Sequence, residues 1–156
     1  MKTLTIRWEV KTWEQISRDL LYSVLSLRAE VFVVEQNCPY QDVDGKDPKA
    51  LHVLGYQNGE LAAYARLFGP GDYFEHASIG RVVTSPTHRG LGLGKELMKQ
   101  AIESLEQHWG KTVIHISAQA YLERFYADFG FIRSGENYLE DDIPHLKMLR
   151  NPGPQS

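Results

Sequence analysis

Long apolar runs are missing from this sequence. The first ten residues, MKTLTIRWEV, contain no apolar stretch of the length that a signal peptide needs, and no later stretch approaches the roughly 20 residues of a membrane-spanning helix. The pattern therefore predicts a cytoplasmic protein with no membrane partner.

Cysteine and excess basic charge are also scarce. Cys38 is the only cysteine, so no disulfide can form within the chain, and a lone thiol with no histidine near it in sequence is more often inert than nucleophilic. Lysine and arginine number 17 against 20 acidic residues, which gives a net charge of −3. This balance argues against a nucleic-acid partner, which needs a basic face, and suits a cationic substrate better.

Low-complexity segments and internal repeats are absent as well. The 156 residues are 42% hydrophobic and 24% charged, as in soluble globular proteins, and they suffice for one core but not for two ordinary domains. We expect a single domain over residues 1–150 and a disordered tail over residues 151–156.

The most informative stretch runs from residue 79 to residue 109, IGRVVTSPTHRGLGLGKELMKQAIESLEQHW. Its first six residues are apolar and β-branched, which predicts a buried strand over 79–84 that ends before Pro86. A glycine-rich loop follows, and after the loop comes an amphipathic helix. The apolar face of that helix holds Leu97, Met98, Ala101, Ile102 and Leu105.

This strand, loop and helix form a candidate anion site. Glycines let the backbone approach a bulky ligand, and the first N–H groups of a helix have no partner inside the helix. The positive end of the helix dipole adds to the attraction, together with the charges of Arg89 and Lys95. The stretch therefore predicts a phosphate-bearing cofactor.

The spacing of the loop separates several known phosphate-binding patterns. A Walker A loop fails, because Arg89 stands in place of its first glycine and Glu96 in place of its hydroxyl. A dinucleotide fingerprint fits weakly, since Gly90, Gly92 and Gly94 give GxGxG rather than GxGxxG. A plain glycine turn stays open as an alternative. The remaining pattern is Arg89-x-x-Gly92-x-Gly94.

Around this stretch the chain alternates between strands and helices. Asn58-Gly59 is a strong hairpin signal between two apolar runs, and the crossover through the loop helix predicts a parallel partner for strand 79–84. Thr12 and Gln15 fit a capping box that opens a first helix ending near Phe32. The expected strands are Thr3–Val10, Leu51–Gln57, Leu61–Phe68, Ser78–Thr84, Val113–Gln119, Phe131–Ser134 and Ile143–Leu149, with a short helix over Tyr121–Phe129 that Gly130 stops.

The Arg89-x-x-Gly92-x-Gly94 pattern resembles the acetyl-CoA pyrophosphate loop of the GCN5-related N-acetyltransferases (GNAT), and FYADFGF, residues 125–131, is similar to the tyrosine-bearing helix of that family. The segments FVVEQNCPYQDVDG, IGRVV and YLEDDIPHLKM resemble the small bacterial ElaA-like branch. The resemblance implies an α/β (α+β) fold with a mixed, mostly antiparallel sheet that is splayed between two parallel strands and flanked by helices. It also implies an acyltransferase that uses acetyl-CoA as co-substrate.

The resemblance assigns roles to particular residues. Pantetheine would pair with the backbone of Val82 and Val83, one of which would also stabilise the oxyanion. Tyr126 matches the family's tyrosine and would protonate the departing thiolate. The diphosphate would be bound after Arg89 by the backbone N–H groups of Gly90, Leu91, Gly92, Leu93, Gly94 and Lys95.

The general base is less well specified. Glu35, at the end of the first helix, and His145, in the last hairpin, are the candidates, and a surface carboxylate and a structural histidine are the alternative interpretations. No metal site is predicted, because the histidines lack ligand spacing and Gly45 comes fourth in the Asp42–Asp47 loop, whereas an EF-hand needs glycine sixth.

Two acidic groups bear on the substrate. If both face one cleft, their field would attract a polyamine-like, lysine-like or aminoglycoside-like amine; solvated faces are the alternative. They are Glu35, Asp42, Asp44 and Asp47 after the first helix, and Glu136, Glu140, Asp141 and Asp142 in the last hairpin.

Three functional hypotheses follow. The first is an acetyl-CoA-dependent transfer to a primary amine of a small molecule or protein, by direct attack in a ternary complex. The second is a non-catalytic acyl-CoA-binding or regulatory module, and the third a nucleotide-binding domain. An exposed strand in the last hairpin is compatible with a homodimer.

Overall fold

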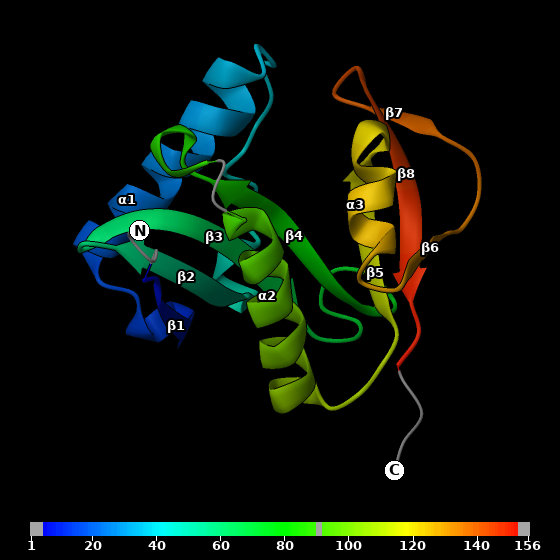
Figure 1. Ribbon diagram of the computed structural model, residues 1–156, viewed down its shortest axis with the longest axis horizontal. Helices are drawn as coiled ribbons and strands as arrows, with labels where there is room; N and C mark the ends of the chain where they lie inside the picture. Colours follow the sequence, from blue (N-terminus) through cyan, green and yellow to red (C-terminus); the bar gives the residue numbers. More distant parts are fainter. Residues whose placement is uncertain (1–4, 90–91, 153–156) are drawn as a thin grey trace.

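A single mixed sheet organises the molecule (Figure 1). The structure is a computed structural model that describes residues 5–89 and 92–152. The sheet order is β1-β2-β3-β4-β5-β8-β6, and β7 pairs with β8. The strands are β1 (Arg7–Thr12), β2 (Leu51–Gln57), β3 (Glu60–Phe68), β4 (Ala77–Thr84), β5 (Ile114–Gln119), β6 (Phe131–Arg133), β7 (Tyr138–Glu140) and β8 (Ile143–Arg150).

Among the described strands only β4 and β5 run parallel, and they separate almost at once. Their pairing is limited to Ala77 with Ile114 and Ser78 with His115, whereas all other neighbours pair antiparallel. Beyond Ser78 the two strands diverge, so the sheet is splayed at its centre. The predicted fold class and the parallel crossover are therefore confirmed.

The β2–β3 hairpin turns at the predicted dipeptide. Asn58 has φ 52° and Gly59 has φ 79°. Positive φ at both central residues is typical of the type I′ turn, whose twist matches that of the strands that it joins. This local signal was enough to predict the hairpin correctly.

Helices cover both faces of the sheet. On one face lies α2 (Leu93–Trp109), which packs on β2, β3 and β4, and Figure 1 shows it in front of these strands. On the other face α1 (Arg18–Arg28) packs through Val24 and Leu27 against Tyr64 of β3. Side chains alternate along β3, so Ala63 and Ala65 belong to the α2 side and Tyr64 to the α1 side.

Shorter helical segments follow α1 and β5. A π-helical segment, η2 (Ala29–Glu35), continues α1 without a break, and α3 (Glu123–Ala127) follows β5 after a 3-10 turn. The α3 helix is followed by Gly130 at φ 93°, and α2 ends at Gly110 with φ 83°, as predicted. Together α1 and η2 carry the first helix to Glu35, three residues past the predicted end at Phe32.

The N-terminal boundaries differ from the prediction. The first strand covers Arg7–Thr12 rather than Thr3–Val10, and residues 3–4 lie outside the described residues. Gln15 Oε1 does accept the Thr12 N–H, at 2.9 Å, but the box opens only a 3-10 turn. The α1 helix starts after Ser17, whose Oγ accepts the Leu20 N–H at 3.1 Å.

Two further predictions concern the C-terminal part. The predicted last hairpin is present as the β6–β8 pair, but the prediction missed β7, which pairs with the first residues of β8. The predicted disordered tail, 151–156, lies outside the described residues from 153 onward.

Candidate active site

A cleft of about 740 Å³ opens where β4 and β5 separate. One wall is β4 from Ile79 to Thr84, and the opposite wall contains Ser117 and Gln119 of β5. Residues of η2, of the loop that follows it and of the β7–β8 turn complete the lining. The volume lies within the range of about 300–1,000 Å³ that is usual for small-molecule sites.

A β-bulge in β4 frees backbone groups at this cleft. The register moves from Arg66 opposite Gly80 to Tyr64 opposite Val83, so that Arg81 and Val82 together face one residue of β3. Arg81 has φ 48°, a conformation that side chains other than glycine rarely adopt. Since β5 has already diverged, Val82 has no sheet partner on either side within the described strands.

Two aspartates of the loop after η2 hold the bulge in place. Arg81 Nε lies 2.9 Å from Asp42 Oδ1, and its Nη2 lies 3.4 Å from Asp44 Oδ2. Tyr40 donates its hydroxyl to Asp42 at 2.9 Å, and its ring lies 5.5 Å from the Arg81 guanidinium. The loop is thereby fixed beside the strand that lines the cleft.

Two buried arginines complete this ion-pair network. Arg28 Nη1 lies 2.8 Å from Asp47 Oδ1, and Arg66 Nη1 lies 2.9 Å from the same oxygen. Arg28 also contacts Asp42 at 2.9 Å, and Arg66 contacts Asp44. Hydrogen bonds and charge from Arg28 and Arg66 outweigh burial and lower the pKa of Asp47. Burial also opposes the ionisation of Asp44, but the hydrogen bond and the charge of Arg66 outweigh it and hold the pKa of Asp44 well below its usual value.

The network corrects one sequence-based hypothesis. The acidic group after the first helix does not present a free negative field to the cleft, because Asp42, Asp44 and Asp47 are neutralised by three arginines. Its remaining member, Glu35, forms a bidentate ion pair with Arg89, at 2.6 and 2.8 Å. The Arg89 hydrogen bonds lower the pKa of Glu35.

The predicted diphosphate loop is described only in part. Gly90 and Leu91 lie outside the described residues, and Arg89 lines the cleft. Gly92 is the N-cap of α2 at φ 73°, and its carbonyl oxygen accepts the Glu96 N–H at 3.2 Å. The backbone N–H groups before it belong to Leu93, Gly94 and Lys95.

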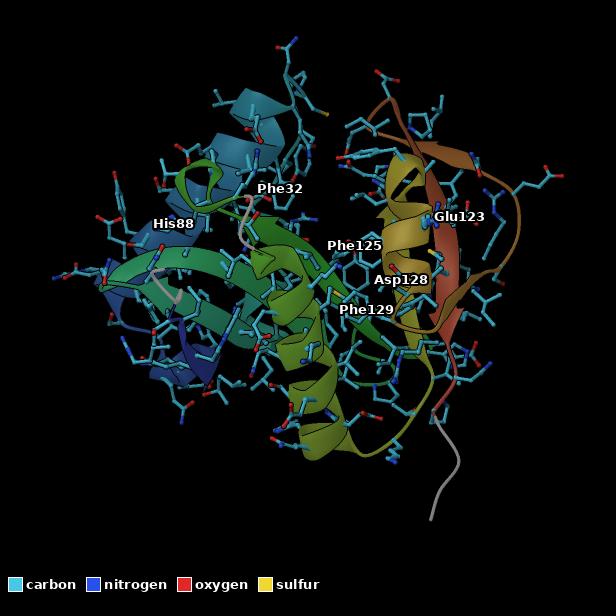
Figure 2. The ribbon with its side chains drawn as sticks, in the orientation of Figure 1. Phe32, His88, Glu123, Phe125, Asp128 and Phe129 are labelled. Atoms are coloured by element: carbon cyan, nitrogen blue, oxygen red, sulfur yellow. The ribbon has the colours of Figure 1, made fainter. Side chains whose placement is uncertain are left out.

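Gly94 is not required by the packing that the structure shows. A Cβ on Gly94 would meet only Phe125, at 3.7 Å, which is ordinary contact. In Figure 2 Phe125 and Phe129 project from α3 toward α2. A glycine in a first helical turn is less favourable than alanine, so a different reason for glycine is needed here.

Tyr126 lies on α3, between Phe125 and Phe131, whose rings meet its own edge to face. The residue is only 8% exposed and lines the cleft. Burial raises the pKa of Tyr126 to about 12, so the phenol stays protonated. Among the described residues its hydroxyl has no hydrogen-bond partner.

His145 lies on β8 opposite Gln119 of β5 and is 7% exposed. Its Nδ1 lies 2.7 Å from the carbonyl oxygen of Ile143. Because a carbonyl can only accept, Nδ1 carries the proton in the neutral imidazole, which leaves the lone pair on Nε2. Nε2 lies 3.4 Å from Glu140 Oε2.

The cleft thus contains some of the predicted site residues and not others. Val82, Val83, Arg89, Tyr126, Glu35 and His145 all line it, whereas Gly92 to Lys95 lie at the start of α2. Sequence reasoning missed Arg81 and the tyrosines Tyr40 and Tyr73, which also line the cleft. No sequence signal indicates a positive φ at an arginine. The Asn-Cys-Pro-Tyr turn before Asp42 was the one available hint of an ordered loop.

Metal-binding clusters and membrane-spanning helices are both absent from the described residues. Over 5–89 and 92–152, no cluster of three or more histidine, cysteine, aspartate or glutamate side chains is arranged to hold a metal ion. None of the helices described is both long enough and apolar enough to span a bilayer.

Comparison with known proteins gives the family. Residues 14–151 match the family model described as the acetyltransferase (GNAT) domain. The chain belongs to the GNAT family. As a GNAT protein with the acyl-CoA N-acyltransferase fold, it is an acyltransferase whose co-substrate is an acyl-CoA.

Relatives extend this GNAT assignment over nearly the whole chain. Protein ElaA of Escherichia coli (strain K12) is 46% identical over 147 residues, which cover 93% of this chain and 96% of that protein. The crystal structure of an acyl-CoA N-acyltransferase from Pseudomonas aeruginosa superposes with a TM-score of 0.90 at 44% identity, covering 94% of this chain and 99% of that one. The crystal structure of Escherichia coli ElaA gives a TM-score of 0.88 at 44% identity, covering 94% and 100%. The predicted resemblance to the ElaA-like branch is confirmed.

Proposed function

We propose that this protein is an acetyl-CoA-dependent N-acetyltransferase that acetylates a primary amine of a small molecule or protein by direct attack in a ternary complex. One observation carries the proposal. The cleft between the diverging strands β4 and β5 contains both the unpaired backbone of Val82 and the unpartnered hydroxyl of the buried Tyr126.

The described residues fit a coenzyme A thioester. An extended pantetheine arm would pair with Val82 and Val83 along the side of β4 from which β5 has diverged. The diphosphate would lie at the start of α2, where the positive helix end and Arg89 favour an anion. Close approach of that ligand explains the glycine at position 94. The N–H groups proposed for the diphosphate are those of Gly90, Leu91, Gly92, Leu93, Gly94 and Lys95.

The transfer requires one bond to form and one to break. The amine nitrogen attacks the thioester carbonyl carbon, and the Val82 or Val83 N–H stabilises the oxyanion. The carbon–sulfur bond then breaks, and the sulfur takes a proton from Tyr126, which solvent later restores. Burial raises the pKa of Tyr126 to about 12 and so makes it a weaker acid, but the same desolvation makes the departing thiolate more basic, which works in the opposite direction.

Glu35 and His145 stay the proposed bases for the proton that the amine loses. Arg89 lowers the pKa of Glu35 and makes it a weaker base, whereas His145 has a free Nε2 lone pair. The geometry therefore favours His145.

Turnover of acetyl-CoA with a panel of amines tests the proposal. Tyr126→Phe should lower kcat by roughly 10²-fold or more and leave the Kd for CoA within about twofold, because only the proton donor is lost. Tyr22→Phe is the matched control, since Tyr22 is 78% exposed on α1. Tight CoA binding without turnover of any amine would instead support the non-catalytic acyl-CoA-binding module.

We also propose a homodimer through the outer edge of the sheet. The short strands β6 and β7 form this edge, and Ile132 and Leu139 on them are 65% and 69% exposed. Exposed edge strands can pair with a second copy. Light scattering of the wild type and of an Ile132→Lys, Leu139→Lys double variant tests this, and a wild-type monomer would refute it.

A further inference from the structure

One face of the β5–β8–β7 part of the sheet is polar and lines the cleft. Along β5, Ile114, Ile116 and Ala118 are buried in the core on the α2 side, so Ser117 and Gln119 point to the opposite face. Residues that pair directly share a face. The pairing of Gln119 with His145 and of His145 with Tyr138 therefore brings β5, β8 and β7 together on this polar face. Ser117, Gln119, Glu140 and His145 all line the cleft from it.

Hydrogen bonds organise these side chains around Glu140. Tyr138 donates its hydroxyl to Ser117 Oγ, and Ser117 donates to Glu140 Oε1 at 3.3 Å. The other oxygen, Oε2, lies 3.4 Å from His145 Nε2, and the Tyr138 ring stacks on the imidazole with centroids 6.2 Å apart. Glu140 is half exposed and has no lysine or arginine nitrogen within 4 Å among the described residues. Its charge is therefore available to a ligand.

We propose that Glu140 and His145 form the acceptor subsite, in which Glu140 binds the ammonium group of an alkylamine and His145 Nε2 removes its proton. This inference rests on the proposed function. An alkylamine with a pKa near ~10 reaches the enzyme as an ammonium ion and must lose a proton before it can attack. The proton passes from nitrogen to Nε2, which leaves a neutral amine and an imidazolium beside the Glu140 carboxylate; the second N–H proton, which the nitrogen loses after attack, goes to solvent.

A second observation points to a ligand in this same cleft. Tyr126 is more than nine-tenths buried, its hydroxyl has no partner among the described residues, and it lines the cleft together with Glu140 and His145. The amine, the base His145 and the acid Tyr126 can thus all meet in this cleft. Glu140 differs in this respect from the carboxylates across the cleft, which arginines already neutralise.

Other charged groups near His145 define the expected pH behaviour. Glu140 and Tyr138 face it from β7, Asp141 lines the cleft from the β7–β8 turn, and Lys46 lines it from the loop after η2. Lys147 pairs with Ser117 on the same face of β8 but is not part of the cleft lining. With two carboxylates and one lysine lining the acceptor side of the cleft, the balance there favours a cation. An arylamine is already neutral at pH 7, so it would need neither the charge of Glu140 nor the removal of a proton by His145 before it attacks.

The test compares cadaverine with aniline as acceptors. Glu140→Gln should raise KM for cadaverine about tenfold, because a hydrogen bond to a charged group is lost, and should barely change KM for aniline. His145→Gln should lower kcat for cadaverine by about 10²-fold at pH 7 and much less near pH 10, where the amine is already neutral. Glu140→Asp should restore part of the affinity. Glu136→Gln, a change of the same kind outside the cleft lining, should leave both acceptors unaffected.

Binding experiments separate this inference from the proposed function. Cadaverine titrated into the CoA-bound protein should bind about tenfold more weakly to Glu140→Gln than to the wild type, whether or not turnover occurs. Glu140-dependent binding without acetyl transfer would retain the subsite and refute the transferase. Turnover with an unchanged KM in Glu140→Gln and an unchanged pH profile in His145→Gln would overturn the subsite and retain the transferase. If His145→Gln fails to bind CoA, and so is misfolded, the Glu140 variants decide alone.

Discussion

Arg89 and Glu35 form a bidentate ion pair that joins the end of η2 to the segment leading into α2, with N–O distances of 2.6 and 2.8 Å. Arg89 is also the residue that we propose for the coenzyme diphosphate, in which case the two anions would compete for one guanidinium. We expect Glu35→Gln to tighten CoA binding by about twofold to fivefold, since an exposed ion pair is weak and competes only modestly with a ligand. Isothermal titration calorimetry measures the change.

Two controls accompany this prediction. Arg89→Gln should weaken CoA binding, and Glu35→Gln added to it should have no further effect, because the competition is gone. The effect of Glu35→Gln should also shrink at 1 M salt, where the Debye length is only ~3 Å. Equal weakening by both single changes would contradict competition and would mean that the intact pair builds the site.

The buried network around Asp47 predicts a large loss of stability. Arg28 is fully buried and contacts both Asp42 and Asp47, so Arg28→Met would leave the three aspartates of the network with only two arginines and one negative charge unbalanced. We expect the free energy of unfolding to fall by about 3–5 kcal/mol, measured by urea denaturation. Arg133→Met is the control, because its pair with Glu123 is 42% and 40% exposed and should contribute far less to stability. Similar losses in both variants would show that burial does not govern these pairs.

Features of the fold with a local cause were predictable from the sequence. The Asn58-Gly59 turn, the stop at Gly110 and the strand–loop–helix unit depend on residues a few positions apart, and all three are present. The parallel pairing of β4 and β5 was predicted from the strand–helix–strand connection between them, because such connections are right-handed crossovers between parallel strands in nearly all proteins.

Features that depend on distant residues were not predictable. Asp44 belongs to an acidic run in sequence, and its neutralisation depends on Arg66, 22 residues away. The positive φ of Arg81 requires the aspartates that hold its side chain. The capping box at Thr12 was recognised correctly, but Ser17 offered a second cap that begins the actual helix. Local signals identify candidate boundaries, and tertiary contacts select among them.

Gly80 gives a way to fill the cleft without disturbing the fold. It lines the cleft on β4, and a Cβ built there would meet no atom within 4 Å. We expect Gly80→Val to keep the melting temperature and to lower kcat/KM for acetyl transfer at least about tenfold by occupying substrate space. The Kd for CoA of the same variant shows which substrate used that space.

Gly55 supplies the opposite control. A Cβ on Gly55 would lie 2.6 Å from the ring of Trp8, outside the cleft. Gly55→Ala should therefore lower stability by about 1–3 kcal/mol through overpacking and leave kcat/KM of the folded protein unchanged. Full activity of Gly80→Val would show that the cleft is not where the reaction takes place.

His115 predicts a loss of stability in mild acid. Its ring stacks on Phe74 with centroids 3.8 Å apart, and burial, followed by the charges of Lys147 and His76, lowers its pKa to about 4. The unfolded chain binds the proton near pH ~6.5, so between pH 6.5 and 4 the unfolded state holds more protons than the folded one. The stabilisation is complete above 6.5, falls as the pH drops through this window and is gone below 4. Burial lowers the pKa of His52 in the same direction.

Melting temperatures at pH 7.5 and pH 4.5 measure this effect. His115→Phe keeps a ring on Phe74 and removes the ionisable group, so its melting temperature should fall less between the two pH values than that of the wild type. A difference of a few degrees is expected, about 1 kcal/mol once screening by water around the half-exposed ring is allowed for. The slope that remains in His115→Phe reports His52 together with the network aspartates, because the unfolded aspartates begin to bind protons near pH 4.5 while the folded ones stay ionised. Identical pH dependence in the two proteins would show that His115 is protonated equally in the folded and unfolded states.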